Sequence, residues 1–148
     1  MSKTVTILKQ GDAETLHVMG VDVTFLCGPE TTGGAWSLME NVVPRHAGPP
    51  PHHHPWSEAY YVIDGALRFS IDGRDQVAGA GDFVYVPGGA VHGFRGESET
   101  PARVLVFDAP AHAEAFFHEV GREVKEMPRD MAKVTRIAEQ HQIHFARE

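Results

Sequence analysis

Short strand-like segments, separated by turns that contain glycine and proline, follow one another along most of this chain. They span residues 4–8, 15–19, 21–26, 36–43, 58–64, 66–71, 74–78, 83–86 and 103–107. Segments this short and closely spaced are typical of an all-β sandwich or barrel. The pair Asp72-Gly73 between two of them is a strong hairpin signal. The fold class we predict is therefore all-β.

After Pro110 the spacing of apolar residues changes to that of an amphipathic helix, and Gly121 is placed to end it. The apolar positions of this pattern are Ala113, Phe116, Phe117 and Val120. A second helix is predicted from near Pro128 towards Gln140. We expect both helices, within about residues 110–142, to pack outside the β-structure, and they carry no recognisable chemistry.

Length and composition indicate one domain, residues 1–148, with its β core at about 15–108. The chain has 148 residues and 42% hydrophobic content, which suits a single core. Its net charge of -7 disfavours a phosphate-binding basic face, so we expect no nucleic-acid partner. No apolar run is long enough to cross a membrane, and residues 1–10 lack a signal-peptide core, so we expect no membrane partner and a cytoplasmic protein. The lone Cys27 predicts no internal disulfide.

Three consecutive histidines follow a proline-rich segment and precede a glutamate. In an extended chain alternate side chains share one face, so His52, His54 and Glu58 are predicted to point the same way, with His53 opposite. A fourth ligand, His92, follows an apolar strand and a Pro-Gly-Gly turn, where a sheet that folds back brings it near. Three imidazoles and one carboxylate are a plausible ligand set for a divalent metal ion.

With these spacings the sequence resembles the cupin superfamily. The first cupin motif contains H-x-H, three residues, Glu, six residues and Gly, which are here His52, His54, Glu58 and Gly65. The second contains Gly, five residues, Pro-x-Gly, two residues and His, which are here Gly81, Pro87, Gly89 and His92. Two positions depart from the family pattern: Gly48 stands three residues before His52 rather than five, and Gly96 replaces a frequent asparagine.

The resemblance implies a small single-domain cupin of the quercetinase-like sort. Such a protein folds as a jelly-roll barrel, or double-stranded β-helix, and here one or two short C-terminal helices follow it. It also implies one divalent transition metal ion near a barrel mouth, and iron, manganese, nickel, cobalt, copper and zinc all suit these ligands. Small cupins are commonly dimers, so a homodimer is the expected assembly.

Several aromatic side chains are candidates for a substrate pocket, although aromatic residues in a barrel more often belong to its core. The candidates are Tyr60, Phe83, Tyr85, Phe94 and Trp56. Glu58 is the only acid among the predicted ligands, so we assign it a second role as a general base and name it the catalytic residue.

Three functions fit this site, and each has a small-molecule substrate or ligand. The first is a quercetinase-like dioxygenase that acts on a small chelating enol or flavonol. The second is a redox-neutral isomerase, decarboxylase or lyase that acts on a sugar or keto acid, with the metal as a Lewis acid. The third is a cupin that binds a small molecule without catalysis. The resemblance favours the dioxygenase.

Overall fold

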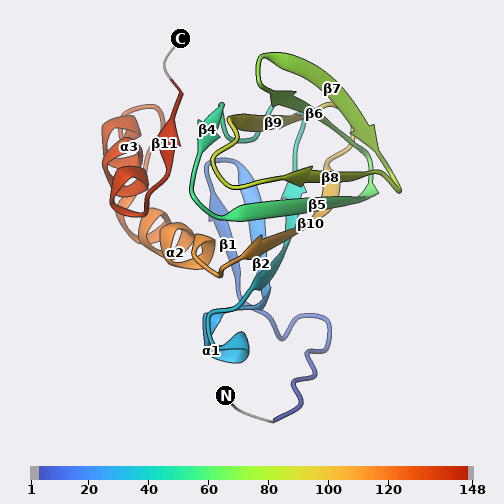
Figure 1. Ribbon diagram of the computed structural model, residues 1–148, viewed down its shortest axis with the longest axis vertical. Coiled ribbons are helices and arrows are strands. Elements are labelled where there is room, and N and C mark those ends of the chain that lie inside the picture. The colour runs from blue at the N-terminus through green and yellow to red at the C-terminus, as the bar shows by residue number, and fades with distance from the viewer. Residues whose placement is uncertain (1–3, 147–148) are drawn as a thin grey trace.

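The computed structural model describes residues 4–146 and consists mainly of two antiparallel sheets (Figure 1). The first sheet, in spatial order, contains β1 (Thr15–Val18), β2 (Val21–Cys27), β3 (Ser37–Val43), β10 (Ala102–Ala109), β5 (Ser57–Asp64) and β8 (Phe83–Val86). The second contains β11 (His144–Phe145), β4 (His52–His53), β9 (His92–Gly96), β6 (Ala66–Ile71) and β7 (Arg74–Gly79). The predicted all-β fold is confirmed.

Alternation of side chains along the strands builds the interior between the two sheets. β3 and β10 bury every second residue, which is the pattern of a strand with one face on a core. Val43, Val62, Val104 and Leu67 are each 0% exposed and come from both sheets. The inner faces therefore form one apolar core, and any polar residue on them is buried with it.

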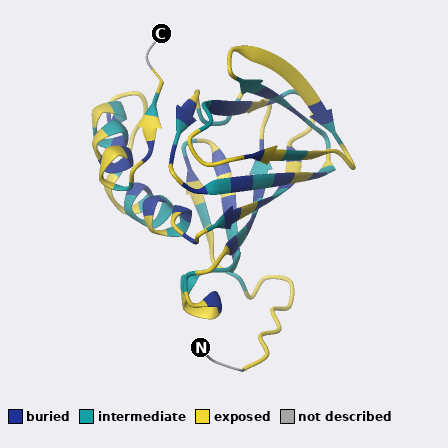
Figure 2. Cartoon of the chain, in the orientation of Figure 1, coloured by how far each residue is buried: buried dark blue, intermediate teal, exposed yellow. Residues whose placement is uncertain are grey.

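The N-terminal lead differs from its prediction. Residues 4–8 form no strand, and the side chains of Val5 and Ile7 are largely exposed. The β-branched composition of the segment favours a strand, but no neighbouring strand in the described chain pairs with it, and a strand without a partner is not stable. Figure 2 shows this lead as an exposed trace that leaves the sheets near α1 (Pro29–Thr32).

The C-terminal helices cover one side of the sheets (Figures 1 and 2). α2 (Ala113–Glu123) and α3 (Met131–Gln140) turn buried stripes inwards, and β11 then pairs with β4. The predicted stop at Gly121 is wrong. The helix continues through it to Glu123 because α2 packs a buried face that includes Val120, and this packing outweighs the low helix propensity of one glycine.

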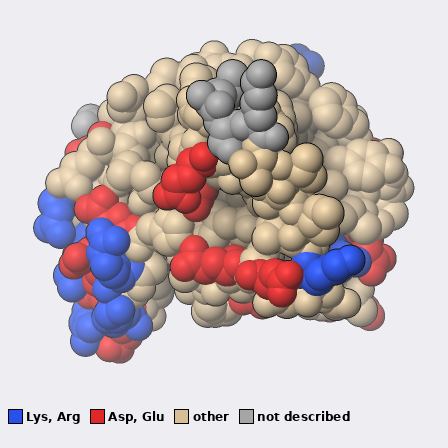
Figure 3. Space-filling view, turned by 90° about the horizontal axis from the view of Figure 1, so that it is seen from below, with Lys and Arg blue, Asp and Glu red and all other residues tan. Residues whose placement is uncertain are grey.

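Charged side chains of both signs are mixed on the surface of these helices. On the face seen in Figure 3, Lys and Arg gather with Asp and Glu on the side of α2 and α3. Arg129 pairs with Glu126 at 2.8 Å, and Lys133 lies 3.7 Å from Asp130. In residues 4–146, no helix has the length and apolar character that crossing a bilayer requires.

Candidate metal centre

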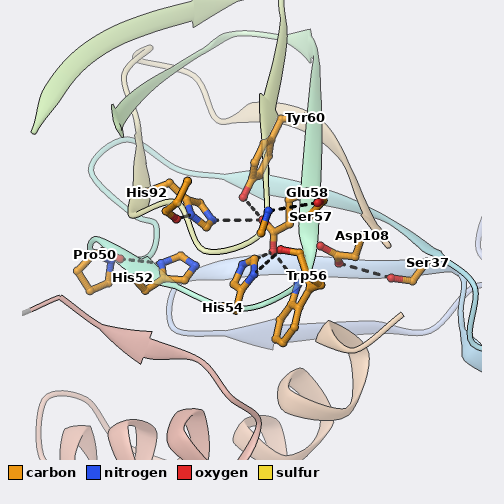
Figure 4. Close-up of polar contacts among 12 residues, drawn as sticks. Ser37, Pro50, His52, His54, Trp56, Ser57, Glu58, Tyr60, His92 and Asp108 are labelled. Atoms are coloured by element: carbon orange, nitrogen blue, oxygen red, sulfur yellow. Dashed lines mark hydrogen bonds and ion pairs between the residues drawn. The ribbon is translucent and has the colours of Figure 1, made fainter. Parts of the chain in front are cut away.

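Pairing between β4 and β9 brings two distant histidines together. His52 and His92 are cross-strand partners in the second sheet, and their ring centroids lie 4.4 Å apart. His54 follows directly after β4, and its ring centroid lies 5.0 Å from that of His92. One ligand nitrogen from each of the three rings lies within 4.8 Å of the others, as the close-up in Figure 4 illustrates. The predicted convergence of three imidazoles is present.

Backbone carbonyls hold the outer nitrogen of each ring. The Nδ1 atom of His52 lies 2.9 Å from the carbonyl oxygen of Pro50, that of His54 lies 3.0 Å from Trp56, and that of His92 lies 2.9 Å from Ala90. A carbonyl oxygen only accepts hydrogen bonds, so each Nδ1 carries the proton and donates it. The Nε2 atoms are then the ring nitrogens available to the common point, which is the arrangement that metal-binding histidines require.

Glu58 reaches the same point from the first sheet. Its carboxylate oxygens lie 2.9 Å from Nε2 of His54 and 3.5 Å from Nε2 of His92. Both nitrogens are buried, and neither makes a hydrogen bond to any of the described residues. A carboxylate this close to two imidazole nitrogens requires a positive charge between them, which either a proton or a metal cation supplies. This observation fits a divalent metal ion held by His52, His54, His92 and Glu58, and the neutral-imidazole and carboxylate set suits several transition metals.

The residues predicted to share one face do converge, but they do not lie on one strand as the sequence analysis assumed. One extended strand was assumed from His52 to Glu58, whereas β4 ends at His53, and β5, which carries Glu58, belongs to the other sheet. The ligands therefore face one another across the interior. The ring of His53 does not converge with the other three and packs instead beside His144, with a centroid distance of 5.3 Å.

Burial and mutual repulsion set the charge of the cluster. Burial, followed by the neighbouring His92, lowers the pKa of His52 to about 4. Burial works to raise the pKa of Glu58, but the close approach of His54 and His92 to its carboxylate outweighs burial and holds that pKa well below its ordinary value. At neutral pH the site therefore holds an ionised carboxylate and a neutral His52, both ready to act as ligands.

The lowered pKa of His52 predicts how the metal-free protein responds to acid. The unfolded chain binds a proton at this residue below about pH 6.5, whereas the folded protein does not until about pH 4, so stability falls as pH decreases between these values. We expect a loss of about 3 kcal/mol over this window. Urea unfolding at several pH values measures it, and His52→Gln should flatten the slope. An equal slope in wild type and variant would contradict the assignment.

Two further side chains hold Glu58 in place. The hydroxyl of Tyr60 donates a hydrogen bond to Oε2, and Nε1 of Trp56 donates one to Oε1 at 3.3 Å. Burial, followed by the charge of Glu58, raises the pKa of Tyr60 well above its ordinary value, so the phenol keeps its proton. Trp56 also stacks on the His54 ring at a centroid distance of 4.1 Å.

Asp108 is a buried acidic residue next to Glu58, and the sequence analysis did not identify it. It stands opposite Glu58 in the pairing of β10 with β5, is 0% exposed, and accepts a hydrogen bond from Ser37 at 3.4 Å (Figure 4). Burial and the nearby Glu58 carboxylate raise its pKa well above the ordinary value. Strand alternation could have indicated this position, because Asp108 is an even number of residues from the inward-facing Val104 and Val106. It was missed because the predicted strand ended at residue 107.

A cavity of about 250 Å³ opens onto this cluster. Of the five pocket candidates, Trp56, Tyr60 and Phe94 line it, together with the ligands His52, His54 and Glu58. Phe83 and Tyr85 do not, and their assignment to the pocket is wrong. They are 63% and 59% exposed because β8 turns Val84 and Val86, the alternate positions, towards the interior.

The helices predicted to lie outside the β-structure complete the cavity. α2 contributes Phe116 and Phe117, α3 contributes Met131, and β11 contributes Phe145. The amide of Ala146 also donates a hydrogen bond to the carbonyl of Pro51, at 2.9 Å, which ties the C-terminal segment to the strand that carries His52. The expectation that the helices carry no chemistry therefore needs correction, because they shape the space next to the ligands.

Both departures from the motif pattern have a steric basis. A Cβ at Gly96 would overlap the carbonyl oxygen of Pro44, so an asparagine has no space there. A Cβ at Gly48 would overlap the carbonyl oxygen of Phe94, and its φ of +136° also favours glycine. Glycine at these positions lets the proline-rich segment pack closely against β9, on which His92 lies.

Comparisons with known proteins agree with this geometry. The sequence profile of the Cupin domain family matches residues 38–108. Quercetin 2,3-dioxygenase of Bacillus subtilis is 25% identical over 116 residues, which are 78% of this chain and 34% of that protein. The chain thus spans about a third of the length of this curated relative.

Solved structures share the fold at lower identity. The polyketide cyclase RemF of Streptomyces resistomycificus superimposes with a TM-score of 0.65 at 22% identity, over 72% of this chain and 80% of that one. An RmlC-like cupin of Shewanella frigidimarina gives a TM-score of 0.65 at 21% identity, over 78% of this chain and 99% of that one. These likenesses concern the fold alone.

Proposed function

Because this chain is a small cupin, we propose that it is a metal-dependent enzyme that oxidises a small chelating enol, such as a flavonol, with dioxygen. The observation that carries this proposal is the convergence of imidazole nitrogens from His52, His54 and His92 and of the Glu58 carboxylate beside a cavity. The similarity to a protein named quercetin 2,3-dioxygenase supports the choice of oxidation. We also propose that the chain is a single domain.

Metal binding at this centre is assigned to His52, His54, His92 and Glu58. A divalent transition metal ion supplies Lewis-acid chemistry and, where it is redox-active, electron transfer. The backbone hydrogen bonds on the three Nδ1 atoms orient the rings before any ion arrives. The apolar side chains that α2, α3 and β11 contribute to the cavity lining make its surface poorly hydrated.

Glu58 is the residue to which we assign the proton transfer. Its carboxylate is ionised at neutral pH and lines the cavity, so it can accept the proton of an enol hydroxyl and leave the substrate as the enolate. The hydroxyl of Tyr60 remains protonated and keeps one carboxylate oxygen oriented. Burial and the Glu58 charge raise the pKa of Asp108, which favours its uncharged form and so limits the negative charge beside the enolate.

Oxygen consumption tests the proposal directly. The protein, loaded in turn with iron, manganese, nickel, cobalt, copper and zinc, is mixed with a panel of flavonols and simple enols in an oxygen-electrode chamber. Uptake with at least one redox-active metal is expected, and no uptake with any combination would overturn the dioxygenase. Turnover that proceeds unchanged under argon and with zinc would instead establish a redox-neutral reaction, and tight binding without turnover a binding protein.

A second copy of the chain is the partner that we propose. The outer face of the first sheet carries exposed Tyr61, Phe83, Tyr85 and Phe107, and β8, which bears two of them, is the edge strand. An exposed aromatic face beside an unpaired edge favours burial, and a two-fold axis can bring the same patch of two identical chains together.

Lysine substitution on this face should separate the dimer. We expect wild type to have twice the chain mass of 16.2 kDa in light scattering, and Phe83→Lys combined with Tyr85→Lys to have the single mass, because two charges cannot be buried in an apolar interface. Val77→Lys, at an exposed position on the edge of the other sheet, is the control and should remain a dimer. A monomeric wild type would contradict the proposal.

A further inference from the structure

Asn41 is a buried polar residue in the apolar wall of the cavity, and the metal centre does not use it. It lies on β3, is 5% exposed, and lines the cavity. Its Oδ1 atom makes no hydrogen bond to any residue of the described chain. An unpaired buried polar group costs about 1–3 kcal/mol, so its side chain destabilises the ligand-free protein. A bound molecule that pairs with it would recover this free energy.

Strand register places Asn41 at the end of the interior remote from Glu58. In the first sheet Ser37, Asp108 and Glu58 form one cross-strand row, whereas Asn41, Val104 and Val62 form another. The two rows are four residues apart on β3, which is roughly 13 Å at the rise of a strand. A ligand that reaches both the histidines and Asn41 is therefore elongated and carries a polar group at each end.

The cavity wall between the histidine cluster and Asn41 is apolar. Met39 lies between the two rows, and the cover adds Phe116, Phe117, Met131 and Phe145. Among the described residues that line the cavity, none is Lys or Arg. A substrate carboxylate or phosphate along this wall would be buried without a counter-charge, which is costly. Sugar hydroxyls would be buried without hydrogen-bond partners, which also costs free energy.

We propose that Asn41 determines specificity and that the substrate is an elongated molecule with an uncharged apolar body, an enol at one end and a hydroxyl at the other. The enol faces the histidines and Glu58, so this part rests on the proposed function. The distal hydroxyl donates a hydrogen bond to the Asn41 amide. A site that pairs a buried amide oxygen with a substrate hydroxyl discriminates strongly against an analogue that lacks the hydroxyl, because that analogue leaves the oxygen unpaired.

Binding without turnover tests the inference. Zinc-loaded protein under argon is titrated in a calorimeter with 3-hydroxyflavone and with flavonols that carry one added hydroxyl at the 3′ or 4′ position. We expect one of the hydroxylated compounds to bind about tenfold more tightly than the parent. Asn41→Leu should bind the parent and the hydroxylated compound with equal affinity, since leucine has a similar size and no polar atom.

Thermal unfolding separates a ligand-binding role from a structural one. The ligand-free Asn41→Leu protein should unfold at the same temperature as wild type or higher, because the substitution removes an unpaired buried carbonyl oxygen. Leu38→Met, on the same strand but outside the cavity lining, is the matched control and should keep the preference for the added hydroxyl.

Two kinds of outcome are distinguishable. Equal affinity of wild type for all the flavonols, a preference that persists in Asn41→Leu, or marked destabilisation of that variant would overturn the role of Asn41 and leave the dioxygenase proposal intact. Absence of binding by every flavonol, including the parent, would overturn the chelating-enol substrate and the inference together.

Discussion

Replacing His92 by alanine is expected to lower metal affinity by more than about 100-fold. Loss of an outer-sphere partner typically costs 10- to 100-fold, and His92 is proposed as a direct ligand, so its loss costs more. The ring is fully buried, its Nδ1 atom is held by a backbone carbonyl, and its Nε2 atom faces the cluster. Elemental analysis of the purified protein and competition with a chromophoric chelator measure the loss.

Two controls make this result specific to the ligand. His92→Gln retains most of the side-chain volume, so it separates loss of an imidazole from the cavity that alanine creates. His53→Ala removes a ring from the same histidine triplet that packs against His144 rather than converging with the others, and it should retain metal at the wild-type level. Equal metal loss in His53→Ala, or full metal content in His92→Ala, would refute the assignment.

Replacing Glu58 by glutamine is expected to lower turnover by about a hundredfold to ten-thousandfold, the usual contribution of a general base. Glutamine preserves the shape and still accepts a hydrogen bond from Tyr60, but it cannot accept a proton from the substrate. Metal content should fall less than in His92→Ala, because all three imidazoles remain. Steady-state rates with the substrate found by oxygen uptake, together with metal analysis, test both parts.

Tyr60→Phe is the comparison for this variant. It leaves the carboxylate in place and removes only the hydroxyl that orients one of its oxygens, so we expect a smaller loss of turnover than for Glu58→Gln. Unreduced turnover in metal-loaded Glu58→Gln would show that the carboxylate is not the base, even if it remains a metal ligand.

Local periodicity in the sequence was sufficient for much of the fold. The bounds of β6 and β8 match their predicted segments, because strand alternation and the turns at Asp72-Gly73 and Gly79–Gly81 are local signals. Local signals were misleading where a distant contact decides. Residues 4–8 have strand composition, but no strand of the described chain pairs with them, and Gly121 ends no helix because the packing of α2 carries the helix on to Glu123.

The ligand residues were also predictable, since their spacing is a property of the chain itself. Spacing did not reveal how they meet, because that depends on two sheets closing over one another, with His52 and His92 paired in one and Glu58 in the other. It did not predict which aromatic residues face inwards either. Phe83 and Tyr85 are on the outside because β8 turns the alternate residues Val84 and Val86 towards the interior.

The sequence by itself determined the β-rich fold and pointed to the residues of the candidate metal centre, because both follow from side-chain type and short-range spacing. Only the tertiary structure revealed the buried Asp108 opposite Glu58, the helical cover over the cavity, and the unpaired amide of Asn41. The physical reason is that burial, pKa and hydrogen-bond satisfaction depend on which distant residues surround a group. Those neighbours are set by strand register and sheet packing.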